Sequence, residues 1–231
     1  MDIGKAFTFV FDDKDWVVKV LIGIGILVAG LVLSWLIIPG ILAGLLLSGY
    51  ALEITRRVIR GEVEVLPAWE DWGQLLIDGL QVAVIGVVYA LPMIIMSACV
   101  GAPLQWLSEG SEVASGFFGF AVGCVNFLWA IVLSLLLPAA IAKFAAEGEL
   151  AAAFQFGDVI ALVRDNLATY VITAVMVWVT AIIASLGLLF CFMGVFFTAV
   201  YAQLVNGYLY GQAYLEATGN SPQVISGEST S

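Results

Sequence analysis

The sequence contains no histidine among its 231 residues. Histidine is the commonest general base and the commonest metal ligand in proteins, so its absence argues against most acid–base and metal chemistry. The cysteines Cys99, Cys124 and Cys191 have no C-x-x-C spacing, and without histidine partners we expect no zinc or redox site. No glycine-rich nucleotide-binding pattern occurs either. We therefore predict no enzymatic activity and no cofactor.

Basic residues are also scarce. The chain has 8 lysines and arginines against 18 acidic residues, which gives a net charge of −10. Nucleic-acid binding needs a basic stripe on the protein surface, so we expect no nucleic-acid partner.

Hydrophobic residues are what the sequence has in excess. They make up 62% of the chain and charged residues only 11%, whereas an average soluble domain is about 45–50% apolar and about 25% charged. The composition predicts an integral membrane protein that is surrounded by lipid bilayer. The beginning does not read as a cleavable signal peptide, because Asp12, Asp13 and Asp15 precede an apolar run long enough to span.

Segments of about 20 mostly apolar residues predict membrane-spanning helices. We place six spans, at 18–38, 41–57, 75–98, 116–142, 168–187 and 192–213. They pair as three helical hairpins, 18–57, 75–142 and 168–213, in one all-α domain, 1–217, followed by a disordered tail, 218–231. The second span is short and follows the turn dipeptide Pro39-Gly40, so 41–57 is either a full span or a re-entrant half-helix.

The positions of the basic residues predict the orientation. All eight fall in residues 1–19, 56–74 and 143–167, and cytoplasmic loops of membrane proteins collect lysine and arginine. We therefore predict a multi-pass protein of the cell membrane with both termini in the cytoplasm. Cys99 and Cys191 fall near the opposite face, and a disulfide between them is left open.

The segments that join the hairpins resemble one another. Gly61, Gly148 and Gly219 each stand where a hairpin ends, and glycine readily adopts the left-handed conformation that stops a helix. Aromatic and acidic residues follow the first two glycines, and a similar stretch, 7–16, precedes the first hairpin. We interpret this pattern as a threefold repeat, in which each unit is a short interfacial amphipathic helix followed by a hairpin.

Small residues recur at four-residue spacing in the second helix of each hairpin. Such a row lies on one helix face and lets two helices approach closely in lipid. The sequence predicts packing inside the bundle, or contact between copies, at three rows: Gly40, Gly44 and Ser48; Ser115, Gly119 and Gly123; and Gly207 and Gly211.

Four polar residues in or beside the spans are candidate functional residues: Glu53, Asp78, Asn126 and Asp165. Glu53 precedes Arg56 and Arg57 by three and four residues, which favours ion pairs at the membrane edge over a functional ion site. Asp78 and Asp165 occupy comparable places at the starts of their spans, where each is either a solvated helix-start acid or a gate or proton carrier. Asn126 can hydrogen-bond across helices or contribute to a solute site.

Several strings resemble a known family. They are 13–23 (DKDWVVKVLIG), 38–39 (IP), 48–50 (SGY), 57–62 (RVIRGE), 69–75 (WEDWGQL) and 78–80 (DGL). The sequence resembles an archaeal and bacterial membrane protein family catalogued as domain of unknown function 4013, most strongly over residues 1–92 and weakly to about residue 217. The resemblance implies a polytopic membrane protein and supplies no activity, catalytic residue or binding residue.

Two functions fit these observations best. The first is a non-enzymatic structural or accessory subunit, or scaffold, that assembles with a membrane-protein partner or its own copies through small-residue helix faces. The alternative is a transporter- or channel-like protein for a neutral or apolar solute or lipid, because Pro92 and Pro138 interrupt spans and little charge lies near the bilayer middle. An enzyme ranks third, since Asp71, Asp78, Asp158 and Asp165 have no nucleophile–base pair beside them.

Overall fold

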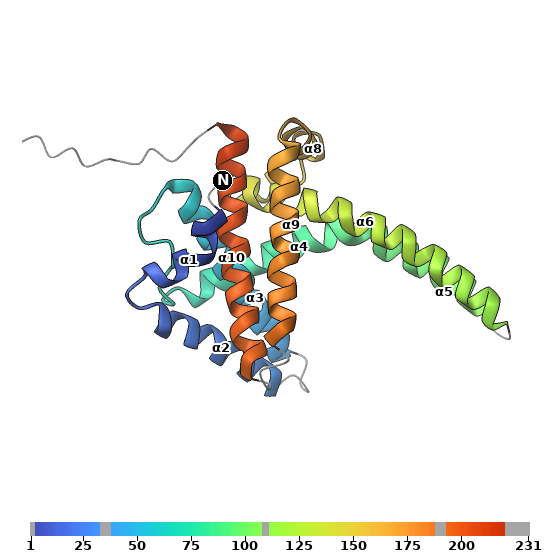
Figure 1. Cartoon of the computed structure of the whole chain (residues 1–231), viewed down its shortest axis with the longest axis horizontal. Helices are drawn as coiled ribbons and strands as arrows, with labels where there is room; N and C mark the ends of the chain where they lie inside the picture. Colours follow the sequence, from blue (N-terminus) through green and yellow to red (C-terminus); the bar gives the residue numbers. More distant parts are fainter. Residues whose placement is uncertain (1–2, 33–37, 108–110, 188–192, 220–231) are drawn as a thin grey trace, which may run out of the picture.

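The computed structural model describes residues 3–32, 38–107, 111–187 and 193–219, and the regular secondary structure among them is helical throughout (Figure 1). The elements are α1 (Ile3–Asp12), α2 (Trp16–Val32), α3 (Ile38–Arg60), α4 (Trp72–Met96), the π-helical turn η2 (Ser97–Gly101), α5 (Ala102–Leu107), α6 (Glu112–Glu147), α7 (Leu150–Ala153), α8 (Phe156–Asp165), α9 (Leu167–Leu186) and α10 (Met193–Thr218). The predicted all-α class is confirmed. Cys191, and with it the Cys99–Cys191 pairing, lies outside the described residues, as does the predicted tail from residue 220 onward.

Four helical stretches are long and apolar enough to cross a membrane: α3, the continuous run Trp72–Leu104, α6 and α9. Trp16–Leu31 in α2 is apolar but shorter, and α10 is not one of the four although it has 26 residues. Helix α10 contacts α1, α2, α3, α6, α8 and α9. Because protein covers so much of it, α10 can carry polar residues that a lipid-facing helix would not.

Helix α3 distinguishes the two interpretations of residues 41–57. It is one continuous helix of 23 residues, about 34 Å long, which exceeds the roughly 30 Å of hydrocarbon in a bilayer. Pro39 and Gly40 lie in its first turn, where a proline is tolerated because no backbone N–H is needed. The turn predicted at this dipeptide is therefore wrong, and a half-helix does not describe the segment.

Each of the three long helix pairs ends at a glycine with a left-handed backbone. Gly61 follows α3 with φ 70°, Gly148 follows α6 with φ 74° and Gly219 follows α10 with φ 70°. The Gly148 N–H donates to the Phe144 carbonyl at 2.8 Å and closes the last turn of α6. Because other residues are strained at such φ values, these glycines end the helices where the sequence predicted.

The segments before the hairpins differ in structure. Helices α1 and α8 each bury one face, through Phe9 and Val10 in α1 and Val159 and Val163 in α8. Residues 62–71, in contrast, contain no helix, so the interfacial helix predicted there is wrong. Pro67 lies within this segment and disfavours a helix, because it lacks a backbone N–H and restricts the residue before it.

Helices α3 and α10 form the centre of the structure. One buried hydrophobic cluster joins them to α1 and α2, and a second joins them to α4, α6, α8 and α9. Helices α3 and α4 touch backbone to backbone: a Cβ added at Gly49 would collide with the Leu75 carbonyl, and one at Gly79 would collide with the Leu45 carbonyl. We call the crossing of α3 with α4 and α10 the hub.

The row Gly207 and Gly211 lies against α3 in this hub. A Cβ added at Gly207 would lie 2.5 Å from the Ala51 carbonyl oxygen, and one at Gly211 would lie 2.7 Å from the Val58 side chain. Close approach of this kind lets helix backbones pack without intervening side chains. The structure thus places the third predicted row at a helix–helix contact.

The other two rows behave differently. A Cβ added at Gly44, Gly119 or Gly123 would meet no described atom within 4 Å, so packing within the chain, predicted at these positions, is not what the structure shows. The Ser48 hydroxyl donates to the carbonyl of Gly44 within its own helix at 2.6 Å. Gly40 of the first row adjoins α2, since its Cα lies 3.7 Å from a Cβ added at Gly30.

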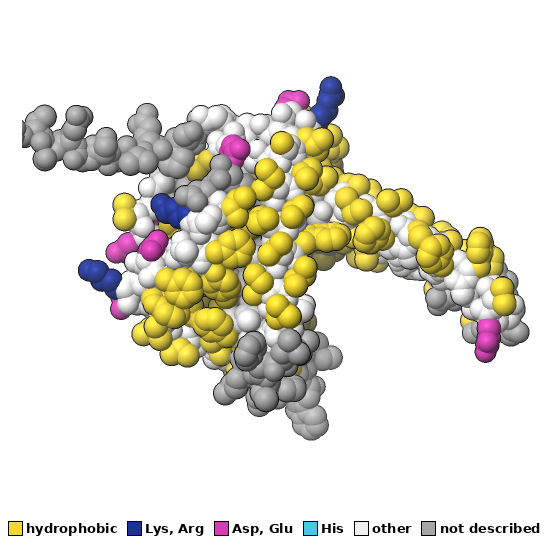
Figure 2. All heavy atoms as spheres, in the orientation of Figure 1, with side chains coloured by type: hydrophobic (Ala, Val, Ile, Leu, Met, Phe, Trp, Pro, Cys, Tyr) yellow, Lys and Arg dark blue, Asp and Glu magenta, His cyan; other side chains and the backbone are white. Residues whose placement is uncertain are grey.

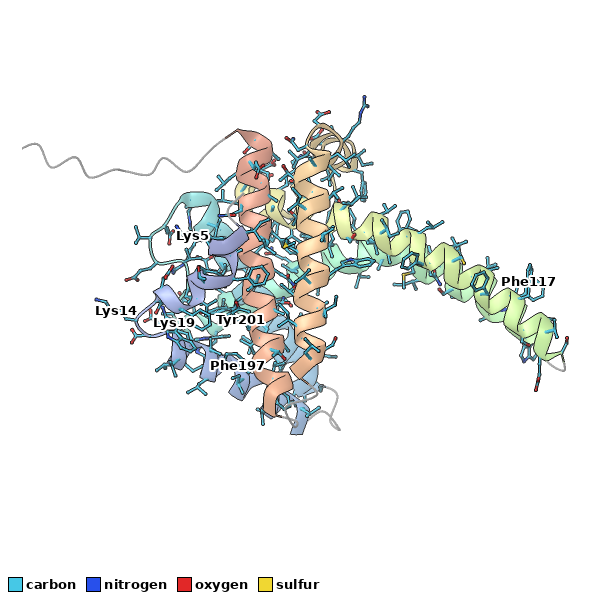
Figure 3. The ribbon with its side chains drawn as sticks, in the orientation of Figure 1. Lys5, Lys14, Lys19, Phe117, Phe197 and Tyr201 are labelled. Carbon is cyan, nitrogen blue, oxygen red and sulfur yellow. The ribbon has the colours of Figure 1, made fainter. Side chains whose placement is uncertain are left out.

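Ser115, Gly119 and Gly123 belong to a long hairpin that extends away from the hub (Figure 1). It consists of residues 91–107 of α4, η2 and α5 and residues 112–132 of α6, and we call it the arm. Its side chains are largely apolar and exposed (Figure 2), and Figure 3 shows Phe117 far out along it. The sequence predicted a bundle of three hairpins, whereas the outer half of the second hairpin packs mainly against itself.

Candidate functional site

A buried ion pair joins α3 to α4 at the cytoplasmic end predicted for these helices. Arg56 donates to both carboxylate oxygens of Asp78, at 2.6 and 3.2 Å, and Gln74 donates to the same carboxylate at 3.1 Å. Asp78 is only 2% exposed. Because a bidentate arginine and an amide satisfy the carboxylate, the charge is tolerated away from water.

Two further groups extend this pair into a network. Glu53 lies 3.6 Å from Arg56 and 3.3 Å from Arg57, at the spacing noted in the sequence, and it also lies 2.8 Å from Arg60, two helical turns along α3. The guanidinium of Arg56 also lies over the ring of Phe144 in α6, 5.6 Å from its centroid. The network, which we call the polar cluster, therefore connects α3, α4 and α6.

The polar cluster changes the interpretation of Asp78 and Asp165. Asp78 is neither solvated nor at a helix end, because it lies inside α4 and is paired with Arg56. Asp165 is the exposed last residue of α8. The two acids, which the sequence placed at comparable positions of a repeat, thus occupy different environments.

Asn126 lies in the arm, outside the hub. Its side-chain amide donates to the Ser97 hydroxyl at 3.1 Å, across the two helices of the hairpin. The Asn126 carbonyl oxygen is buried and has no hydrogen-bond partner among the described residues. The structure therefore supports the helix-joining role considered for this amide.

Three tyrosine hydroxyls fasten the connecting segments to the long helices, a role that the sequence analysis missed. Each donates to a backbone carbonyl: Tyr50 to Pro67 at 2.8 Å, Tyr89 to Ala153 at 2.7 Å and Tyr201 to Phe7 at 2.5 Å. A hydroxyl that donates to a backbone carbonyl of another segment holds the two segments together. Nothing in the one-dimensional pattern separates these tyrosines from those that only pack.

Two lysines complete these attachments. Lys19 donates to Asp13 at 2.6 Å and to the Leu66 carbonyl at 3.0 Å, and thereby holds the segments before the first and second hairpins. Lys143 donates to Gln155 at 2.7 Å and to Asp158 at 2.9 Å, and holds the segment before the third. Figure 3 shows Lys19 and Tyr201 on the side of the structure where α1 and α2 lie.

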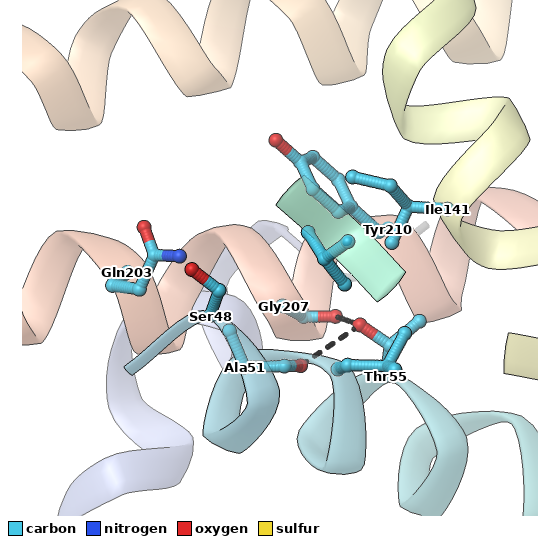
Figure 4. Close-up of a pocket in the computed structure, with 9 residues that line it drawn as sticks. Ser48, Ala51, Thr55, Ile141, Gln203, Gly207 and Tyr210 are labelled. Carbon is cyan, nitrogen blue, oxygen red and sulfur yellow. Dashed lines mark hydrogen bonds between the residues drawn. The ribbon is translucent and has the colours of Figure 1, made fainter. Parts of the chain in front are cut away.

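A small cavity lies one helical turn from the polar cluster, where α3, α4, α6 and α10 meet (Figure 4). Its volume is about 30 Å³. Ser48, Thr55 and Gln203 supply polar groups to its wall, and Gly207 and Tyr210 line it from α10. The Thr55 hydroxyl lies 2.9 Å from the Gly207 carbonyl and 3.0 Å from that of Ala51, and so joins α3 to α10.

The described residues hold no group of three or more histidine, cysteine, aspartate or glutamate side chains that could bind a metal ion. Cys99 and Cys124 are free and exposed on the arm. The contacts between helices described above are hydrogen bonds and ion pairs.

Comparison with known proteins identifies one family. No curated protein and no solved structure matches the chain. The family described as protein of unknown function DUF4013 matches residues 32–193, which include α3 to α9 and therefore most of the hub and the whole arm. The match begins later than the resemblance noted in the sequence, which was strongest over residues 1–92. Because it covers well over half of the sequence, the chain belongs to the DUF4013 family.

Proposed function

We propose that this protein is a non-enzymatic membrane scaffold or accessory subunit that assembles with a membrane-protein partner or with its own copies through the arm. The observation that carries the proposal is the exposure of the arm's aromatic side chains: Trp106 is 77% exposed, Phe117 68% and Phe120 73%. Interface cores are enriched in such residues. At about 150–250 Å² for each buried aromatic side chain, these three alone offer on the order of 400 Å² for contact.

The glycines of the arm support the same proposal. With no described atom within 4 Å of their added Cβ positions, Gly119 and Gly123 leave one side of α6 open to close approach by another helix. Helix association in lipid depends on such approach, because lipid removes the hydrophobic drive that acts in water. No basic residue occurs between Arg60 and Lys143, so no cation interrupts the surface of the arm.

The proposal includes the finer architecture. We infer six spans in three hairpins, each preceded by an interfacial segment, with both termini in the cytoplasm of a cell-membrane protein. The equivalent glycines Gly61, Gly148 and Gly219, and the tyrosine attachment of every connecting segment, support a threefold repeat. The start of α9, the end of α10 and α8 lie at one end of the structure, which supports a common side for these connections (Figure 1).

The test uses the full chain, reconstituted in lipid nanodiscs and isolated from its own membranes by gentle extraction. We expect native mass spectrometry to find more than one copy, or a stoichiometric protein partner, and Phe117→Ala with Phe120→Ala to dissociate the assembly without lowering the melting temperature. Truncating an interface aromatic typically costs about 1–2 kcal/mol of binding. Ile182→Ala on α9, also exposed, is the control that should leave assembly unchanged. A wild-type protein that is monomeric in both preparations refutes the proposal.

The second candidate is passage of a neutral or apolar solute or lipid, and it is favoured by Pro92 inside α4 and Pro138 inside α6, because such helix interruptions are common where transporter helices line a pathway. Liposomes that contain the purified protein distinguish it from the first. Faster entry of small uncharged solutes, or faster lipid exchange between leaflets, than in protein-free liposomes supports passage, whereas equal rates exclude it.

A further inference from the structure

The cavity in the hub has a polar wall in an otherwise apolar region. Ser48 of α3 lies next to Gln203 of α10, and Thr55 lies farther along α3 with its hydroxyl bonded to Gly207 (Figure 4). The remaining wall includes apolar side chains of α4 and α6, Val82 and Ile141. Genuinely dry cavities are apolar, whereas buried water needs polar partners and room.

The polar groups on the cavity wall can form more hydrogen bonds than they make within the protein. The Ser48 hydroxyl donates to the Gly44 carbonyl and the Thr55 hydroxyl to the Gly207 or Ala51 carbonyl, so both oxygens can still accept. The Gln203 amide has two donor hydrogens and a carbonyl oxygen, and it has no hydrogen-bond partner among the described residues. An amide so placed between helices is stabilised if a bound molecule completes its hydrogen bonds.

The volume of the cavity indicates which molecule it can hold. A volume of about 30 Å³ is enough for about two waters, since one water needs roughly 10–15 Å³ measured in this way. We propose that the cavity is a water site, in which bound water links the Gln203 amide of α10 to the Ser48 hydroxyl of α3. The water bridge supplements the direct hydrogen bond from Thr55 to Gly207, and this role is independent of any assembly through the arm.

The register of the helices places this water beside the polar cluster. Leu52 lies on the cavity wall one turn before Arg56 in α3, and Val82 lies one turn after Asp78 in α4. One turn is about 5.4 Å. The water site and the ion pair thus form one polar column along α3, at the contact that holds the first hairpin to the second and third.

Radiolytic hydroxyl-radical footprinting of the full chain in lipid nanodiscs tests the proposal, because radicals formed from bound water oxidise the side chains next to it. Tyr210 lines the cavity, whereas Tyr170 is fully buried in the second hydrophobic cluster and is the internal control. We expect Tyr210 to be oxidised several-fold faster than Tyr170 if the site holds water. Equal oxidation of the two tyrosines in the wild-type protein overturns the proposal.

A substitution separates bound water from water that reaches Tyr210 by another route. Gln203→Leu keeps a similar volume but removes the amide, and we expect Tyr210 oxidation to fall to the level of Tyr170. Gln212→Leu, on the same helix but bonded to Tyr208, should leave Tyr210 oxidation unchanged. Unchanged Tyr210 oxidation in Gln203→Leu also overturns the proposal. Should that variant fail to fold, equal oxidation of Tyr210 and Tyr170 in the wild-type protein still overturns the proposal.

Discussion

The hub and the arm are both built from helices apolar enough to cross a membrane, but the less apolar helix α3 is the one that buries more of its length within the chain. In the most apolar stretch of α3, 44% of the residues are buried within the chain, whereas none is buried in that of α6. Hydrophobicity therefore does not decide which helix face meets protein, because lipid accepts an apolar side chain as readily as a neighbouring helix does. What distinguishes the hub is glycine at the crossing points together with hydrogen bonds and ion pairs between helices.

The two regions also use glycine differently. At Gly49 and Gly79 an added Cβ would collide with a carbonyl of the neighbouring helix, whereas at Gly119 and Gly123 it would meet no atom of the described residues within 4 Å. Four-residue spacing occurs in the arm, yet the tightest contacts of the hub are those of Gly49 with the Leu75 carbonyl and of Gly79 with the Leu45 carbonyl, between α3 and α4. A small residue thus permits close approach, and the rest of the structure determines whether an approach occurs.

The largest expected effect comes from enlarging a glycine in each region. We expect Gly79→Leu to abolish a monodisperse folded protein, because the Leu45 backbone cannot move aside and overpacking typically costs about 1–3 kcal/mol even where side chains can adjust. Gly119→Leu should leave the melting temperature unchanged or raise it, since glycine disfavours a helix interior by up to about 1 kcal/mol. Size-exclusion chromatography after heating measures both, and equal losses would remove the distinction between hub and arm.

The next effect sharpens the comparison through buried charge, which the hub contains at Asp78, whereas Glu112 in the arm is exposed. We expect Asp78→Ala to destabilise the fold by about 3–5 kcal/mol, because Arg56 is left without its buried partner. Replacing both members, Arg56→Met with Asp78→Leu, should recover most of the loss. Thermal unfolding in detergent measures the series. A double variant less stable than Asp78→Ala would contradict the view that the unpaired charge causes the damage.

The smallest effect concerns a single hydrogen bond. Thr55→Val keeps the shape of the side chain but removes the bond to Gly207 between α3 and α10, and we expect a loss of about 1 kcal/mol. Ser134→Ala in α6 is the matched control, because that hydroxyl bonds only to Ile131 within its own helix. A shift in melting temperature as large for Ser134→Ala as for Thr55→Val would show that the hydrogen bond between α3 and α10 stabilises the fold no more than one within a single helix.

The sequence predicted the features that depend only on a residue and its neighbours along the chain. The glycines that end α3, α6 and α10 were identified from sequence, because their left-handed backbone is a property of one residue and its neighbours. The pairs of Glu53 with Arg56 and Arg57 follow from helical spacing alone. Residues 62–71 were predicted as a helix on aromatic and acidic composition, although Pro67 argues against one.

Contacts between distant segments could not be predicted in this way. Asp78 was identified as a candidate, but its partner Arg56 lies 22 residues away on another helix. The tyrosine attachments join residues 17, 64 and 194 positions apart. Their hydroxyls look like any other tyrosine in an apolar helix, because the carbonyl that each one satisfies is placed by the fold.

The sequence by itself determined that this is a chain of long apolar helices, where those helices stop and which side chains pair along one helix, since each follows from composition or from neighbours within a turn. Only the tertiary structure decided which glycines touch another backbone, that Asp78 is buried against Arg56, and that half of one hairpin stands apart as an arm. These depend on how whole helices cross, and in a lipid environment the apolar pattern carries little information about that choice.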